Sequence, residues 1–418
     1  MTTETGATAS DLPQELQGNG LAAVTLSIEW QDARAAHRDE WHVPRFSVWR
    51  EADLLPAAIA AALPGSQTGA CHQTQVAAGE LVPPWSDERL VDAPLSAFDR
   101  HHLKGLAVTP RRGRFYPQGF FAGMKGVFSD AVLPARLSGL HEERMEVDFN
   151  HPLAPFPLRV GLEIEAILPE YDRRGGRCVD PLYQLMRHPG MLAPLRDGTL
   201  TDYGDHGEGL ERMDDRDDAL FYSQPRRVPH LDTHSLTQVE RLYGRLLPAR
   251  AKVLDLMGSF DSHLQQAEIG SLQVLGLNAE ELEANAAADS TLLHDLNRDP
   301  SLPLDDASLD AVVCTAAIEY LTRPLEVLAE ARRVLRPGGL LAVTFSNRWF
   351  PTKAIHIWSE LHEFERLGMV TQWLDQAGFT GLQTLTQRGW PRPQDDPHAG
   401  QRHLADPLFA VWGHRPVT

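Results

Sequence analysis

Cysteine, basic charge and long apolar runs are all scarce in this chain of 418 residues. The three cysteines, Cys71, Cys178 and Cys314, lie far apart and form no CxxC pair, so neither a disulfide framework nor a zinc cluster is indicated. Acidic residues outnumber basic ones by 57 to 39, which argues against a nucleic-acid backbone as the main partner. No stretch approaches the ~20 apolar residues of a membrane span, and residues 1–20 hold no apolar signal segment. We therefore expect a cytoplasmic protein that binds neither nucleic acid nor membrane.

Length and composition predict a multidomain protein. An apolar fraction of 42% suffices for sizeable cores, and 418 residues exceed one ordinary core. Small polar residues over 1–20 predict a disordered tail. Strand signals dominate 21–168, and a Gly- and Asp-rich stretch over 169–225 indicates a linker. Helix and strand signals then alternate over 226–418.

The C-terminal part has the pattern of a doubly wound α/β sheet. Continuously apolar strands that alternate with helices predict a parallel sheet covered on both faces. The expected strands are 252–257, 272–278, 309–314 and 340–345, with a closing antiparallel pair at 377–387 and 408–415. The expected helices are 233–247, 279–288 and 324–335. A further short helix is expected after the first strand, with Ser262 and Gln265 as its capping box.

The N-terminal part alternates as half-buried strands do. The expected strands are 21–30, 44–49, 71–77, 104–109, 121–128, 144–149 and 158–168. The Ala-rich stretch 54–63 predicts a short helix that ends at the Pro-Gly pair 64–65. These signals predict a β-rich α+β domain.

The string LPLDDASLDAVVCTAAIEYLTRPLEVLAEARRVLRPGGLLAVTFSNR, residues 302–348, resembles class I S-adenosylmethionine-dependent methyltransferases of the type 11 group. The resemblance implies a Rossmann-like fold and S-adenosylmethionine as cofactor, bound outside the carboxyl ends of the strands. The cofactor-binding positions that it implies are Asp255, Met257, Gly258, Ser259, Asn278, Asp295 and Leu296. It implies Glu319, Tyr320 and Asn347 as candidate catalytic residues on the acceptor side, beside Ser346 and Arg348. Asn347 and Arg348 alternatively organise a turn.

The loop within VLDLMGSFDSHL, residues 253–264, departs from the D-x-G-x-G-x-G pattern of that family. Met257, Ser259 and Asp261 stand at the three glycine positions, where a residue without Cβ allows positive φ and close approach to a ligand. Asn278 replaces an acidic residue. It either holds ribose hydroxyls or caps the next helix with Glu281 as its capping-box partner. The loop therefore either still binds the cofactor or keeps the fold without the site.

The string VDFNHPLA, residues 147–154, together with LRVGLEIEAIL after it, resembles FKBP-type peptidyl-prolyl isomerases of the SlyD kind. The resemblance implies an FKBP-like domain over 21–168 whose flap is interrupted by an insert at about 94–154. It implies a pocket formed by Asp39, Trp49, Leu54, Leu55, Val82 and Trp85, with Val82 where the family has a tyrosine. The alternative is that these residues are the core of a β-rich domain.

Three functions are compatible with these features. The first is a methyltransferase whose FKBP-like domain binds a small-molecule, peptide or protein substrate. The second is a non-catalytic binding or chaperone-like protein with a degenerate cofactor loop. The third is a prolyl isomerase with a methyltransferase-like appendage. No metal site is expected in any of them, because the 18 histidines are scattered.

Overall fold

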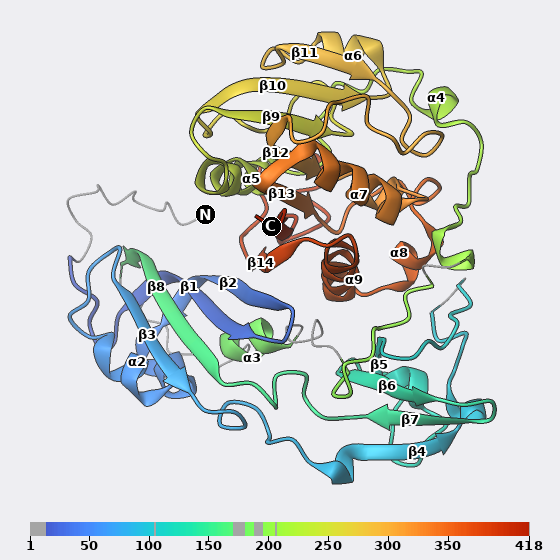
Figure 1. Ribbon diagram of the computed structural model, residues 1–418. Helices are drawn as coiled ribbons and strands as arrows, with labels where there is room; N and C mark the ends of the chain where they lie inside the picture. The colour runs from blue at the N-terminus through green and yellow to red at the C-terminus, as the bar shows by residue number, and fades with distance from the viewer. Residues whose placement is uncertain (1–13, 104–105, 170–179, 188–194, 205–206, 418) are drawn as a thin grey trace.

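One sheet of eleven strands runs through the computed structural model, which describes residues 14–103, 106–169, 180–187, 195–204 and 207–417 (Figure 1). The strand order is β11-β10-β9-β12-β13-β15-β14-β2-β1-β8-β3. Within the same ranges, β4, β7, β6 and β5 form a second sheet, which Figure 1 shows below α8 and α9. The large sheet therefore contains strands from both the N-terminal and the C-terminal part.

The C-terminal strands form the α/β part of this sheet. They are β9 (Ala251–Leu256), β10 (Ile269–Gly276), β11 (Ser290–Leu293), β12 (Leu309–Thr315), β13 (Leu335–Phe345), β14 (Thr380–Arg388) and β15 (Leu408–His414). Strands β9 to β13 pair in parallel, and β15 is antiparallel to both β13 and β14. The predicted Rossmann-like sheet with a closing antiparallel pair is confirmed, although β13 already begins at Leu335.

Helices cover both faces of these strands because successive side chains of a strand point to opposite faces. Leu254 and Val312 belong to a core with α7 and α9, whereas Val253 and Val313 belong to a core with α5. The helices of this part are α5 (Thr233–Leu246), α6 (Ala279–Glu283), η7 (Ile318–Tyr320), α7 (Pro324–Val334), α8 (His356–Glu360) and α9 (Glu363–Gln376). The pattern of 233–247 correctly predicted α5, whose first turn is capped by Asp232.

The N-terminal part adds antiparallel strands and short helices to the same sheet. They are β1 (Leu21–Gln31), β2 (Ala35–Ser47), α1 (Val48–Glu51), η2 (Ala52–Leu54), α2 (Ala57–Ala62), β3 (Cys71–Val76) and β8 (Leu158–Leu168). The predicted strand 44–49 is the end of β2, which passes into α1 at Val48. The expected strands 21–30, 71–77 and 158–168 are confirmed.

The second sheet lies within the segment expected to be an insert. Its elements are η3 (Asp87–Arg89), β4 (Leu90–Pro94), η4 (Leu95–Ala97), β5 (Phe115–Pro117), η5 (Gln118–Phe121), β6 (Pro134–Leu140) and β7 (Arg144–Asp148). The predicted strand 121–128 is wrong, because Phe120 and Phe121 lie in a 3-10 turn that packs on Phe98 and Tyr116. No strand forms over 106–109, and 104–105 lie outside the described residues.

Parallel pairing of β2 with β14 joins the N-terminal and C-terminal strands. The register runs from Leu382 opposite Ala35 to Arg388 opposite Trp41. Side chains reinforce the pairing, since the Thr386 hydroxyl donates to the Asp39 carboxylate at 2.5 Å. Asp39 is buried there, and that burial raises the pKa of its carboxyl group. Its prediction as part of an FKBP-like pocket is wrong, because β2 turns this side chain toward β14.

Three of the other residues of the expected pocket belong to the core that contains residues of β1 and β8. Leu55 and Val82 are buried in this core, and Trp85 packs against it with the Arg196 guanidinium 3.8 Å above its ring. Leu54 is half-buried in η2, and Trp49 is 46% exposed. The described residues therefore place Leu55, Val82 and Trp85 together, without Asp39.

The predicted disordered tail and the predicted linker both contain residues that pack into a core. Leu16 is fully buried, and its backbone hydrogen-bonds to Gly65 and Ser66, so the prediction of a disordered tail is wrong for 14–20. Residues 1–13 lie outside the described residues, as does Cys178. The expected linker contains α3 (Pro181–Met186), η6 (Glu208–Leu210) and α4 (Asp218–Phe221). Leu182 packs into the N-terminal core, and Tyr203 packs into the C-terminal core.

A buried ion cluster holds the second sheet against α8 and α9. Arg114, next to β5, pairs with Glu360 at 2.9 Å and with Glu365 at 3.4 Å. The backbone N–H of Phe115 also donates to Glu365 at 2.8 Å. All three charged side chains are at most 2% exposed. Removing the guanidinium would take a counterion from two buried carboxylates, of which Glu360 would keep its contact with His356 at 3.0 Å, and this loss is more costly than that of an exposed pair.

None of the helices in the described ranges is long and apolar enough to cross a membrane.

We predict that Arg114→Ala lowers the free energy of unfolding by about 3–5 kcal/mol, because it removes the buried counterion shared by Glu360 and Glu365. The matched control is Arg144→Ala, which breaks an exposed pair with Asp92 on the same small sheet and should lower the free energy of unfolding far less, because solvent screens exposed pairs. Urea unfolding followed by circular dichroism measures both variants. Equal unfolding midpoints for the two would show that the cluster does not anchor the sheet.

Candidate functional site

A cavity of about 390 Å³ lies at the carboxyl ends of β9, β10 and β12. This size is within the range of small-molecule sites, and in open α/β sheets this edge is where ligands bind. Its walls come from the loops after these strands, from 218–236 and from 348–350. The predicted site residues that line it are Met257, Gly258, Ser259, Asn278, Asp295, Leu296, Tyr320 and Arg348.

Two glycines let the loops after β9 and β10 approach each other closely. The Gly258 N–H donates to the Leu275 carbonyl at 2.8 Å. A Cβ on Gly258 would overlap the Asp255 carboxylate, and one on Gly276 would overlap the Gly258 carbonyl. Both positions therefore require glycine, although neither is one of the three glycine positions of the family's loop pattern.

Left-handed backbone gathers around the cavity at residues other than glycine. Met257 has φ 61°, His263 has φ 55° and Ala316 has φ 49°, and all three line the cavity. Each such residue costs roughly 1–2 kcal/mol, and strain of this kind clusters at functional sites. Met257 thus adopts the conformation for which the family uses glycine, and its side chain packs against the core with α7 and α9. The loop keeps its turn without the glycine.

Asp255 supports the loop from below and does not line the cavity. It is 2% exposed, and burial raises the pKa of its carboxyl group to about 7. The Ser262 hydroxyl hydrogen-bonds to Asp255 and accepts from the Asn285 amide at 2.9 Å. The predicted short helix with Ser262 as its cap is wrong, because this side chain is used elsewhere and His263 takes a positive φ.

Asn278 is a helix cap, and a different residue supplies the carboxylate nearby. The Asn278 side chain accepts from the Glu281 N–H at 3.1 Å and donates to the Tyr222 carbonyl at 2.7 Å. Glu281 does not complete a capping box. Its carboxylate lines the cavity and accepts from the Ser259 hydroxyl at 2.6 Å and from the Arg226 N–H at 2.5 Å. An acidic residue in the first turn of the helix after β10 was the available signal in the sequence.

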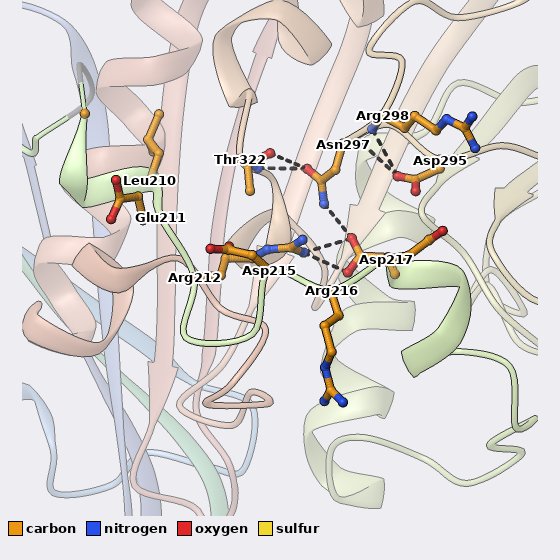
Figure 2. Close-up of a pocket in the computed structure, with 12 residues that line it drawn as sticks. Leu210, Glu211, Arg212, Asp215, Arg216, Asp217, Asp295, Asn297, Arg298 and Thr322 are labelled. Carbon is orange, nitrogen blue, oxygen red and sulfur yellow. Dashed lines mark hydrogen bonds and ion pairs between the residues drawn. The ribbon is translucent and has the colours of Figure 1, made fainter.

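Asp295 lies on the wall of two cavities. One of its carboxylate oxygens accepts from the N–H groups of Asn297 and Arg298. It also lines a second cavity of about 520 Å³, which Figure 2 shows between the 207–218 segment and the loop after β11. This second cavity is polar, with Glu211, Arg212 and Asp217 among its lining side chains.

A charged network holds the segment between the two cavities. Asp218 accepts two hydrogen bonds from Arg212, at 2.8 and 2.9 Å, and one from Asn297 at 2.9 Å. It also pairs at 3.0 Å with Lys353, whose side chain is fully buried. Lys353 further donates to the carbonyl of Arg216 at 2.7 Å. The network therefore fixes the 212–218 segment against the C-terminal part.

The candidate catalytic residues do not lie together. Tyr320 lines the cavity, and its hydroxyl accepts from the Phe350 N–H at 2.9 Å. Glu319 and Asn347 are absent from the cavity lining, and among the described residues each has a buried oxygen without a hydrogen-bond partner. Burial raises the pKa of the Glu319 carboxyl group to about 7. Ser346 donates to the Pro407 carbonyl at 2.5 Å and faces away from the cavity.

The part of the chain that the structure describes contains no cluster of three or more His, Cys, Asp or Glu side chains able to hold a metal ion.

The family model described as "Methyltransferase domain" matches residues 258–343. The chain is 35% identical over 127 residues to the ubiquinone/menaquinone biosynthesis C-methyltransferase of Roseobacter denitrificans, covering 28% of this chain and 50% of that protein. It is 30% identical over 115 residues to the 27-O-demethylrifamycin SV methyltransferase of Amycolatopsis mediterranei, covering 25% and 42%. The matched segments thus span half or less of these relatives. A solved S-adenosylmethionine-dependent methyltransferase from Archaeoglobus fulgidus is 13% identical, with a TM-score of 0.34 and coverage of 47% and 98%.

The strand order of the C-terminal sheet, the position of the cavity and the matched family model all indicate a Rossmann-like methyltransferase fold. The comparisons imply S-adenosylmethionine as the cofactor and give no support to an FKBP-like N-terminal part. The C-terminal part of this chain contains a class I S-adenosylmethionine-dependent methyltransferase domain.

Proposed function

We propose that the chain is an active methyltransferase that binds S-adenosylmethionine in the cavity at the ends of β9, β10 and β12. The observation that carries the proposal is the pair of carboxylates, Glu281 and Asp295, that line this cavity beside the close approach of Gly258 and Gly276. A nucleoside with two hydroxyls and an exocyclic amine needs acceptors of this kind, and its base needs apolar surface. Leu296 supplies such surface on the same wall. The residues present therefore fit the cofactor.

Each of these groups has a role in this proposal. Glu281 takes over the ribose hydroxyls from Asn278, whose side chain is occupied by its cap and by Tyr222. The second oxygen of Asp295 accepts from the adenine amine. The loop 257–261 faces the methionine portion, with Ser259 held by Glu281. When bound, the cofactor supplies a methyl group activated by a sulfonium. Tyr320 lies on the acceptor side, whereas Glu319 and Asn347 act only indirectly in this arrangement.

The test is calorimetric titration of the purified protein with S-adenosylmethionine. Glu281→Gln should weaken binding by at least about tenfold, because hydrogen bonds to a charged acceptor contribute roughly 1.5–3 kcal/mol. Glu283→Gln is the matched control, since Glu283 is exposed on the same helix and does not line the cavity. Absence of any binding heat and any thermal shift at millimolar cofactor would exclude the proposal for the wild-type protein.

A substitution at Met257 tests whether the altered glycine loop still accepts the cofactor. Met257→Gly should bind S-adenosylmethionine as tightly as the wild type or more tightly, because glycine adopts φ 61° without strain. Met257→Val should bind at least about tenfold more weakly, since a β-branched residue is rarely found at positive φ. Titration of both folded variants gives the answer. A Met257→Gly variant that no longer binds would show that the methionine side chain itself holds the ligand.

For the N-terminal part, we propose the domain limits 21–168, with an insert at about 94–154, a linker over 169–225 and the methyltransferase part over 226–418. We further propose an FKBP-like, peptide-binding role for 21–168. The observation that favours it is the exposure of three apolar residues within six positions of the insert, where Phe128 is 73%, Val132 57% and Leu133 41% exposed. Single exposed apolar residues are ordinary, whereas several of them close together are typical of a binding surface.

Serine substitutions at Phe128 and Val132 should abolish any ability of the protein to slow the aggregation of reduced insulin, measured by light scattering. The control is Leu220→Ser, because Leu220 is 70% exposed but lies on α4, outside the insert. Equal activity of the Phe128/Val132 serine variant and of Leu220→Ser would place peptide binding elsewhere.

Proline-limited refolding in the presence of the protein should proceed at the uncatalysed rate, because Val82 lacks the hydroxyl of a tyrosine and Asp39 faces β14.

A further inference from the structure

The acceptor side of the cavity differs chemically from its cofactor side. The carboxylates Asp261, Glu281 and Asp295 all belong to the segments that follow β9, β10 and β11, with Glu281 in the first turn of α6. A second wall is built from the 222–231 segment and from 348–350, which contribute Tyr222, Arg226, Trp349 and other side chains. The two walls therefore suit different ligands, and the charge of the second wall is positive.

Aromatic rings define the shape of this second wall. The Phe350 ring lies 6.0 Å from that of Tyr320 at an interplanar angle of 33°, and 5.6 Å from that of His230 at 84°. The hydrogen bond from the Phe350 N–H to the Tyr320 hydroxyl fixes these two residues relative to each other. Aromatic side chains pack well on planar partners, so a wall of this composition favours a planar ligand.

Arg226 places an uncompensated cation among these rings. Its guanidinium carbon lies 4.4 Å from the centre of the Phe221 ring and 4.9 Å from that of Phe350. The Nη1 atom is buried without a hydrogen-bond partner among the described residues. The backbone N–H of Arg226 donates to Glu281 at 2.5 Å and its Nη2 atom donates to the Phe221 carbonyl at 3.5 Å, so the segment is anchored and Nη1 is the guanidinium nitrogen that lacks a partner among the described residues. A buried donor of this kind is costly until an anion satisfies it.

The neighbouring charges do not supply that anion. Asp218 lines the same cavity but already pairs with Arg212 and Lys353. Arg348, the second guanidinium on this wall, pairs at 3.1 Å with Asp406, which is itself held by Arg392 at 2.6 Å. Arg226 is thus the cation on this wall that a ligand can pair with.

We infer that the methyl acceptor is a planar aromatic compound bearing a carboxylate, which pairs with Arg226 while its ring packs on Phe350 and Tyr320. This inference rests on the proposed function, because it assigns the acceptor half of the same cavity. An alternative role for Arg226, binding the carboxylate of the cofactor itself, is separated from it by the test.

The experiment titrates 4-hydroxybenzoate and the neutral 4-hydroxybenzamide into the protein, with and without saturating S-adenosylhomocysteine. The wild type should bind the acid at least about tenfold more tightly than the amide. Arg226→Gln should remove this difference and leave the affinity for S-adenosylhomocysteine unchanged. Arg227→Gln is the matched control, because Arg227 is exposed and its side chain donates to a backbone carbonyl outside the cavity. Succinate should bind weakly, since it lacks a ring.

The outcomes separate the two proposals. Equal affinity of the wild type for acid and amide would overturn the inference, as would a discrimination that survives Arg226→Gln. Loss of S-adenosylhomocysteine binding in Arg226→Gln would assign the guanidinium to the cofactor and overturn it as well. Failure of the wild type to bind S-adenosylhomocysteine would refute the proposed function, whereas Arg226-dependent binding of 4-hydroxybenzoate to the free protein would still support an aromatic-anion site.

Discussion

The parallel pairing of β2 with β14 is the constraint on which the arrangement of the whole molecule depends. In the C-terminal sheet β14 is the outermost strand, and its unpaired edge would be free to associate with other chains. The N-terminal strands cover this edge with backbone hydrogen bonds along the register from Ala35 to Trp41. Because backbone bonds fix both distance and direction, the N-terminal strands cannot swing relative to the methyltransferase domain without breaking them.

A second set of contacts closes the molecule on the opposite side. Arg114 ties the small sheet to α8 and α9, and the Gln372 amide binds both backbone groups of Thr201. Further along the same segment, Lys353 and Asp218 fix the stretch that forms the wall between the two cavities. The chain that forms one wall of the cofactor cavity is therefore anchored by residues far from it in sequence. The contacts that hold the second sheet and those that hold the cavity wall therefore lie along the same segment of the chain.

The loops around the cavity have glycine where a side chain would overlap its neighbours. At other positions they have larger residues with a strained, positive φ. Gly258 and Gly276 are required by direct overlap, whereas Met257 and Ala316 are held at positive φ by the packing around them. Strain of this kind persists only when surrounding contacts exceed its cost. Buried Asp255, with its bond to Ser262, provides part of that support beneath the loop. The loop is thus altered in sequence but keeps the turn that a ligand needs.

Apolar periodicity predicted the α/β class and six of the C-terminal strands, β9, β10, β12, β13, β14 and β15, because such patterns act over short separations; the short strand β11 was not predicted. The sequence by itself did not reveal the joint sheet, since β2 and β14 are more than 300 residues apart and strand pairing leaves no local signal. Nor did it reveal that Asn278 caps a helix while the carboxylate at this part of the cavity comes from Glu281. Helix caps and ligand contacts use the same residue types, so the sequence could not distinguish the two roles. These points depend on tertiary contacts, which pair Asp39 with Thr386 and Glu281 with Ser259 and leave Arg226 Nη1 without a partner among the described residues.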